Sequence, residues 1–174
     1  MGTLKLGVPP MVDNVRILLV DNHAMVRAGL RRILETHARF QVVAEASDAV
    51  DAVNLLSAGL DCTLALVDMA LPTNDGMWLT RVLRERFPAV LILVLTMHIE
   101  AFSVRRALQA GAHGFLPKAA TFQELVDAVN QVSTDGEYLH PSLANARKPE
   151  RAAGRTSNHE TSQALDVSVS IAKH

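Results

Sequence analysis

The sequence has a single cysteine, nearly balanced charge and no long run of apolar residues. With Cys62 alone, an intramolecular disulfide is excluded and a reducing compartment is expected. The formal net charge of −1 gives no electrostatic reason to expect a nucleic-acid or membrane surface. No apolar stretch approaches the roughly 20 residues that span a bilayer, and the N-terminus lacks the segments of a signal peptide. These absences predict a cytoplasmic protein without a membrane partner.

Short apolar runs alternate with amphipathic segments along the 174 residues, and 49% of the residues are apolar, enough for one core. The runs are continuous, as expected of strands covered on both faces of a parallel sheet. Each is followed by apolar residues at helical spacing. This alternation predicts an α/β fold, a doubly wound (βα)5 unit with a five-stranded parallel sheet and right-handed crossovers. The strands are predicted at 16–20, 41–46, 63–67, 90–95 and 114–116.

Capping residues mark the ends of the predicted helices. Asp48 and Asp75 can cap the second and third helices, because a carboxylate accepts from unpaired N–H groups of a first turn. Thr121 and Glu124 have the spacing of a capping box that opens the fifth helix, and Gly136 ends it. The apolar face of this helix is predicted to be Phe122, Leu125, Val126, Val129 and Val132.

Polar side chains stand where four of the predicted strands end. Asp21 and Asn22 follow the first strand, Asp68 the third, Thr96 the fourth and Lys118 the fifth. Each alone has an ordinary structural explanation, since such residues often cap helices or face solvent. All four ends of a parallel sheet lie at one edge, however, and sites in open α/β sheets lie beyond the carboxyl ends of the strands. The set therefore predicts a functional site at that edge.

The chemistry that suits this set is phosphoryl transfer to a carboxylate. Asp68 can be the nucleophile and form an acyl phosphate. Paired carboxylates need a cation, and oxygen ligands select a hard metal such as Mg²⁺, which also binds phosphate oxygens. Lys118 would contact one phosphoryl oxygen as a point charge, and the Thr96 hydroxyl could donate to another.

Five motifs, in this order, carry a resemblance to a known family. They are Ile17-Leu18-Leu19-Val20-Asp21-Asn22-His23, Val67-Asp68-Met69-Ala70-Leu71-Pro72, Asp75-Gly76, Val94-Leu95-Thr96 and Gly111-Ala112-His113-Gly114-Phe115-Leu116-Pro117-Lys118. The set resembles the receiver domain of bacterial two-component response regulators over residues 15–139. The segments 21–30 and 136–139 resemble the opening and the exit of NarL/LuxR-type regulators.

The resemblance implies a flavodoxin-like strand order of 2-1-3-4-5 and a phosphorelay protein of transcription regulation. It implies that Asp68 is the phosphoacceptor. It also implies a Mg²⁺ site, formed by Asp21, Asn22, Asp68 and the backbone carbonyl of Ala70. The switch and charge-neutralising residues would be Thr96, Phe115 and Lys118. The donor would be a sensor histidine kinase, and a homodimer is possible. The protein would not be an enzyme, beyond assisting its own phosphotransfer and dephosphorylation.

Three residues depart from the family pattern. Asn22 stands where the second acidic residue is usual, which predicts weaker Mg²⁺ binding because one anionic ligand is lost. Met97 follows Thr96 where a small residue is general and could crowd the phosphoryl donor. Pro117 directly precedes Lys118 and could change how the lysine is presented.

The two ends of the chain differ from the rest. Residues 1–14 lack periodicity and are predicted as a flexible leader, and residues 140–152 as a polar linker. Residues 153–174 resemble part of the helix-turn-helix domain of LuxR-type regulators, which has about 60 residues. Most of its first helix and its closing helix have no counterpart, so we expect a disordered remnant with no intact DNA-binding residues. A polar tail of other origin is the alternative.

Three other functions remain open at this stage. A phosphorylation-silent receiver, acting as a protein-interaction module, would fit Asn22, Met97 and the reduced C-terminus. A phosphatase with an aspartate nucleophile would need a second aspartate where Ala70 stands. A flavodoxin-type cofactor binder would need a Ser/Thr/Gly-rich loop after the first strand, and residues 21–24 do not supply one.

Overall fold

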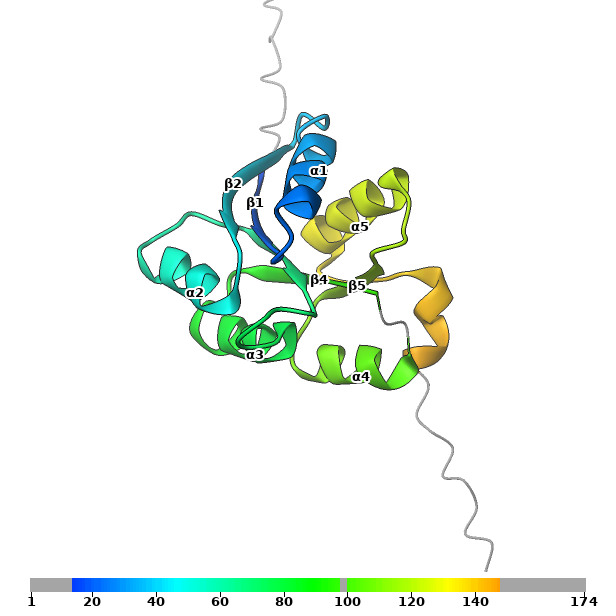
Figure 1. Cartoon of the computed structure of the whole chain (residues 1–174). Helices are drawn as coiled ribbons and strands as arrows, with labels where there is room; N and C mark the ends of the chain where they lie inside the picture. The colour runs from blue at the N-terminus through cyan, green and yellow to red at the C-terminus, as the bar shows by residue number, and fades with distance from the viewer. Residues whose placement is uncertain (1–13, 98–99, 148–174) are drawn as a thin grey trace, which may run out of the picture.

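A six-stranded parallel sheet forms the centre of the molecule in the computed structural model, which describes residues 14–97 and 100–147 (Figure 1). The sheet consists of β1 (Val15–Val20), β2 (Phe40–Ala46), β3 (Leu64–Asp68), β4 (Leu91–Thr96), β5 (Gly114–Pro117) and β6 (Tyr138–Leu139). The helices are α1 (Ala24–Leu34), α2 (Ala49–Ser57), α3 (Gly76–Arg86), α4 (Ala101–Gln109), α5 (Phe122–Asp135) and the 3-10 helix η1 (Pro141–Arg147). The predicted leader, except Asn14, and residues 148–174 with the predicted helix-turn-helix remnant lie outside the described residues.

The strand order is β2-β1-β3-β4-β5-β6, which confirms the expected order and adds one strand. The predicted number of five strands is wrong, because a sixth strand, β6, pairs with β5 in parallel. Gly136 ends α5 in a left-handed conformation (φ 80°) and turns the chain back to the sheet edge. There the Tyr138 amide donates to the His113 carbonyl at 2.9 Å. Two residues are too few to show a strand pattern in the sequence.

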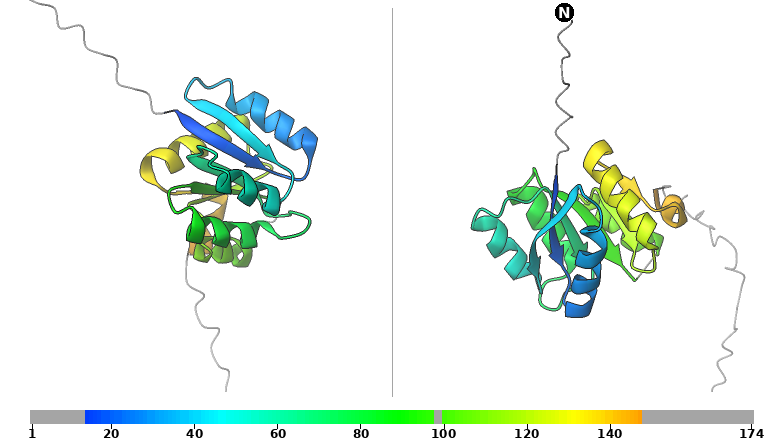
Figure 2. Two further views of the ribbon diagram at one scale, coloured as in Figure 1. Left: turned by 90° about the vertical axis from the view of Figure 1, so that its left-hand side faces the viewer. Right: turned by 90° about the horizontal axis from the view of Figure 1, so that it is seen from above.

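The helices cover both faces of the sheet, α1 and α5 on one face and α2, α3 and α4 on the other (Figures 1 and 2). Each strand alternates its side chains between two apolar clusters, so the strands are buried on both faces. The cluster under α1 and α5 includes Leu34, Leu66, Leu93, Leu125 and Val129, and the cluster under the other three helices includes Val67, Leu79, Val94, Val104 and Phe115.

The predicted helix caps are present. Asp48 accepts from the Asp51 amide at 2.9 Å, and Asp75 accepts from the Trp78 amide at 2.7 Å. Thr121 and Glu124 form the reciprocal capping box of α5. The prediction that Phe122 faces inward is wrong: this side chain is 46% exposed, because it lies in the first turn beyond the part of α5 that packs on the sheet.

The first part of the predicted linker is ordered. Residues 141–147 form η1, which lies beside α4 at the edge of the sheet (Figure 1). Leu143 is only 3% exposed and belongs to the same apolar cluster as Phe115 and Val104. The folded unit therefore continues to Arg147, and one apolar side chain in a polar segment anchors it. None of the described helices is long and apolar enough to cross a bilayer.

Candidate functional site

The ends of β1, β3 and β5 bring two aspartates and a lysine together. Lys118 Nζ lies 2.7 Å from Asp21 Oδ2 and 2.8 Å from Asp68 Oδ2. Both aspartates are 2% exposed. The lysine follows Pro117, and its own amide donates to the Thr96 carbonyl at 2.7 Å. The proline thus leaves the lysine at the strand end, directed at the two carboxylates.

The loop after β1 is held in place around Asp21. Its Oδ1 accepts from the His23 amide at 2.8 Å, and its backbone carbonyl accepts from Arg27 at 2.6 Å. Arg27 also donates to Glu45 at 3.0 Å, which ties the start of α1 to β2. Asp21 therefore does not cap α1; the surrounding residues orient its carboxylate toward the sheet edge.

The charges at this edge depend on one another. Burial alone would raise the pKa of Asp21, but hydrogen bonds from Lys118 and His23 and the lysine charge hold it below its ordinary value. Burial alone would lower the pKa of Lys118, but its contacts with Asp21 and Asp68 raise it. The ionised forms are thus the stable ones for this pair.

The two oxygens of Asp68 have different partners. Its Oδ1 accepts from the Ala70 amide at 3.2 Å. Its Oδ2 is buried and forms an ion pair with Lys118, but it receives no aligned hydrogen bond from the described residues. A Cβ at Gly76 would collide with the Asp68 carbonyl oxygen and lie 2.8 Å from Met69 Cα, so glycine lets α3 start close under this strand end. A buried carboxylate beside a lysine ammonium has the chemistry of a metal ligand or of a nucleophile toward a phosphoryl group.

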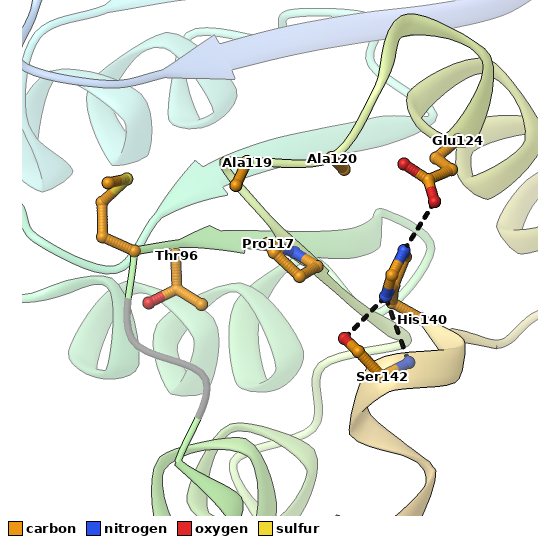
Figure 3. Close-up of a pocket in the computed structure, with 8 residues that line it drawn as sticks. Thr96, Pro117, Ala119, Ala120, Glu124, His140 and Ser142 are labelled. Carbon is orange, nitrogen blue, oxygen red and sulfur yellow. Dashed lines mark hydrogen bonds and ion pairs between the residues drawn. The ribbon is translucent and has the colours of Figure 1, made fainter.

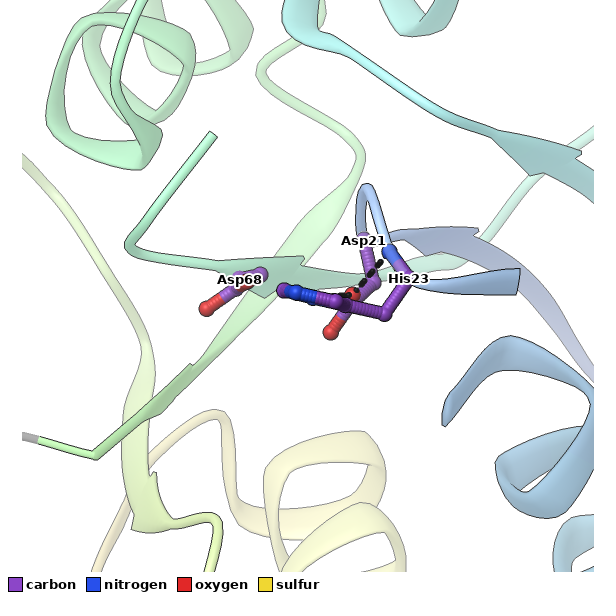
Figure 4. Close-up of side chains that lie close together, drawn as sticks. All are labelled: Asp21, His23 and Asp68. Carbon is purple, nitrogen blue, oxygen red and sulfur yellow. Dashed lines mark hydrogen bonds and ion pairs between the residues drawn. The ribbon is translucent and has the colours of Figure 1, made fainter. Parts of the chain in front are cut away.

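Donor atoms for a metal gather at the same place. Asp21, His23 and Asp68 each offer one ligand atom, and these atoms lie within 4.8 Å of one another (Figure 4). Two buried carboxylates with a neighbouring imidazole are a donor set that fits a divalent cation. Asn22 and Ala70, the other two predicted ligands, are both exposed; Asn22 follows Asp21 directly, and Ala70 stands two residues after Asp68. Sequence reasoning missed His23, although it stands directly after Asp21-Asn22.

The predicted switch residues lie beside this site. Thr96 is 1% exposed at the end of β4 and is paired in register with Pro117. Phe115, two residues earlier on β5, is fully buried in the cluster that also contains Leu143 of η1. Met97 is 72% exposed, so most of its side chain lies in solvent.

A cavity of about 350 Å³ lies between the ends of β4 and β5 and the start of η1. Thr96 and Pro117 lie on one side of it, and Glu124, His140 and Ser142 on the other (Figure 3). His140 Nε2 lies 3.0 Å from Glu124 Oε1, and Ser142 Oγ lies 2.8 Å from His140 Nδ1. The Thr121 backbone, followed by His140, holds the pKa of Glu124 at about 2. We call this His140–Glu124 contact the clasp; no sequence pattern indicates it, because it joins residues 16 apart.

Comparisons with known proteins identify the family. The model of the response regulator receiver domain matches residues 17–130. The chain is 34% identical over 133 residues to the transcriptional regulatory protein DegU of Brevibacillus brevis. The aligned region covers 76% of this chain and 56% of DegU. The chain is 38% identical over 130 residues to the response regulator UvrY of Escherichia coli K12, covering 75% of this chain and 59% of UvrY.

The solved structures agree with these relatives. A two-component response regulator of the LuxR family from Aurantimonas sp. SI85-9A1 superposes with a TM-score of 0.71 at 35% identity, covering 76% of this chain and 94% of that one. The chain thus spans somewhat under three fifths of the length of the curated relatives named here. It belongs to the response regulator receiver domain family, among the LuxR-type two-component regulators.

Proposed function

We propose that this receiver accepts a phosphoryl group on Asp68 from the phosphohistidine of a sensor kinase. The observation that carries this proposal is the buried Asp68 carboxylate at the end of β3, with Lys118 Nζ 2.8 Å from its Oδ2. In the transfer, an Asp68 oxygen forms a bond to phosphorus while the phosphorus–nitrogen bond of the donor breaks. The nitrogen keeps the electron pair and takes up a proton, and an acyl phosphate remains on Asp68.

The residues around Asp68 have separate roles in this step. Lys118 neutralises charge on the phosphoryl oxygens and stays near Asp68 after transfer. Asp21, with Asp68, the Ala70 carbonyl and the Asn22 amide oxygen, would hold Mg²⁺, which offsets negative charge as the phosphoryl group arrives. In this scheme the protein itself receives and keeps the phosphoryl group, so we propose that it acts as the acceptor of the transfer rather than as an enzyme.

The proposed output begins at Thr96. Its hydroxyl donates to a phosphoryl oxygen, which moves the end of β4 toward Asp68 and changes the space beside Phe115. Phe115 contacts the cluster that anchors η1, so the change reaches the segment after α5. DegU, a longer relative, is named a transcriptional regulatory protein, and we propose that the change at η1 serves a regulatory output of that kind. Homodimer formation and a cytoplasmic location are part of this proposal, and DNA binding by these 174 residues is not.

Incubation with acetyl phosphate and Mg²⁺ tests the proposal directly. Intact-mass spectrometry should show the gain of one phosphoryl group by the wild type and none by Asp68→Asn. Asp127→Asn, which changes an exposed aspartate on α5, is the matched control and should be phosphorylated like the wild type. A folded wild-type protein that gains no mass, or gains it without Asp68, would overturn the proposal and favour the silent interaction module.

A further inference from the structure

We propose that His23 supplies an imidazole nitrogen to the cation site of Asp21 and Asp68, so that the site favours first-row transition ions, with Zn²⁺ as the probe, more than an all-oxygen site would. This inference rests on the proposed function because it names the class of metal that the same site takes. It concerns binding alone, so it is tested without a phosphoryl donor.

The geometry around His23 suits a metal ligand. Its Nδ1 lies 3.2 Å from Asp21 Oδ1, and the ligand atoms of Asp21, His23 and Asp68 all lie within 4.8 Å of one another. Neighbouring ligands at about 2.1 Å from an octahedral ion are about 3 Å apart, and opposite ligands about 4.2 Å. Small side-chain rotations therefore bring all three groups onto one ion.

The position of His23 in the chain leaves its ring available for this role. The residue is the N-cap of α1, with an extended backbone, yet its side chain caps no N–H group of that helix. The ring instead extends toward the two carboxylates (Figure 4). Its side chain is 63% exposed, so the ring can adjust without disturbing the core.

The charge balance around Asp68 also favours a bound cation. The residue is 2% exposed, and its Oδ2 has Lys118 Nζ at 2.8 Å but no aligned hydrogen bond from a described group. The same ammonium lies 2.7 Å from Asp21, so one positive charge is shared by two buried carboxylates. A divalent cation held by Asp68, Asp21 and His23 would supply the positive charge that this pair lacks.

Ligand chemistry then sets the preference. Mg²⁺ takes oxygen ligands and holds its waters firmly, whereas imidazole suits Zn²⁺, Ni²⁺ and other transition ions. Asn22 supplies no charge where a third carboxylate would favour Mg²⁺ electrostatically. Because this site offers an imidazole where an all-oxygen site would offer another anionic oxygen, its metal preference shifts from hard ions such as Mg²⁺ toward borderline ions such as Zn²⁺.

The test compares metal affinities of the full chain by calorimetry. His23→Gln should lower Zn²⁺ affinity at least about tenfold, since even second-shell partners of a metal are worth that much, and should change Mg²⁺ affinity by no more than about twofold. Asp68→Asn should also weaken Zn²⁺ binding. His37→Gln, in the loop between α1 and β2, is the control and should bind Zn²⁺ like the wild type.

Long-range ¹H–¹⁵N NMR of the imidazoles identifies the ligand itself. Zn²⁺ at one equivalent should shift His23 Nδ1 first, and an excess of Mg²⁺ should reverse the shift. Unchanged Zn²⁺ affinity in His23→Gln, or a first shift at another histidine, would overturn the inference. Phosphorylation of Asp68 with Mg²⁺ would be unaffected by that result, so the two proposals fail separately.

Discussion

Two of the ionic sites near the carboxyl edge of the sheet differ sharply in burial. Lys118 lies 2.7 and 2.8 Å from carboxylates that are 2% exposed. His140 lies 3.0 Å from Glu124, whose side chain is 41% exposed. An uncompensated buried charge is expensive, whereas an exposed pair in water contributes little. We therefore expect the loss of the Lys118 contacts to destabilise the fold more than the loss of the His140–Glu124 contact.

The two contacts also differ in how they are assembled. Glu124 is fixed within its own turn of α5, through Thr121, before His140 reaches it. Lys118 meets Asp21 across 97 residues of chain, and only the closed sheet brings them together. The acidic site thus requires the whole fold, while one half of the clasp is already present in a local motif.

The largest expected effect comes from removing the buried cation. Lys118→Met leaves Asp21 and Asp68 close together without a positive charge, so the free energy of unfolding should fall by about 3 kcal/mol. Urea unfolding without metal measures it. Mg²⁺ should stabilise this variant more than the wild type, and adding Asp21→Asn should recover much of the loss. A loss no greater than that of His140→Ala would contradict the distinction between the two contacts.

The next prediction compares the two contacts that hold η1, which are the buried Leu143 side chain and the His140–Glu124 clasp. Leu143→Ala removes a side chain that is 3% exposed, and truncation of a buried leucine costs about 2 to 3 kcal/mol at sites that relax partly. His140→Ala should lower stability less, while hydrogen exchange of residues 141–147 becomes faster in both variants. Similar stability losses in the two variants would show that the clasp, rather than Leu143, holds η1.

A smaller change adds charge to the acidic site. Asn22→Asp places a third carboxylate beside Asp21 and should lower stability without metal by about 1 kcal/mol. Mg²⁺ affinity should rise on the order of tenfold, because the number of charged ligands sets affinity at such sites. Calorimetric titration of both proteins measures this. Equal Mg²⁺ affinities would show that the amide at position 22 costs the site nothing.

The sequence predicted those parts of the molecule that depend on local pattern or on the parallel topology. Buried strands that end in Asp21, Asp68, Thr96 and Lys118 must meet at one edge, and the structure brings them there. The metal roles of Asn22 and Ala70 stay predictions. The sequence did not reveal β6, whose two residues form no period.

Two further contacts depend on side-chain direction, which a sequence pattern does not encode. The His23 ring turns back toward Asp21 although its neighbours belong to the start of α1. Leu143 is the one large apolar side chain among small and polar residues in 141–147, and only its place beside the sheet makes it part of the core. Contacts of one residue with a distant element leave no repeating signal.

The smallest effect is a pH dependence at the clasp. The Thr121 backbone and His140 lower the pKa of Glu124 from 4.5 to about 2. A carboxyl whose pKa is lower in the folded state stabilises the fold above its unfolded pKa, and this contribution disappears as the pH falls from about 4.5 to about 2. Glu124→Gln keeps a side chain that can complete the capping box but carries no charge.

The wild type should therefore exceed Glu124→Gln in its urea midpoint by a small margin at pH 5, and this margin should shrink as the pH falls from about 4.5 to about 2. Asp21, whose pKa is also lowered, contributes to acid unfolding in both proteins, so the difference between them isolates Glu124. Glu85→Gln, at an exposed position of α3, is the control and should show no such convergence. A margin that stays constant down to pH 3 would mean that Glu124 acts through its shape as a cap and not through its charge.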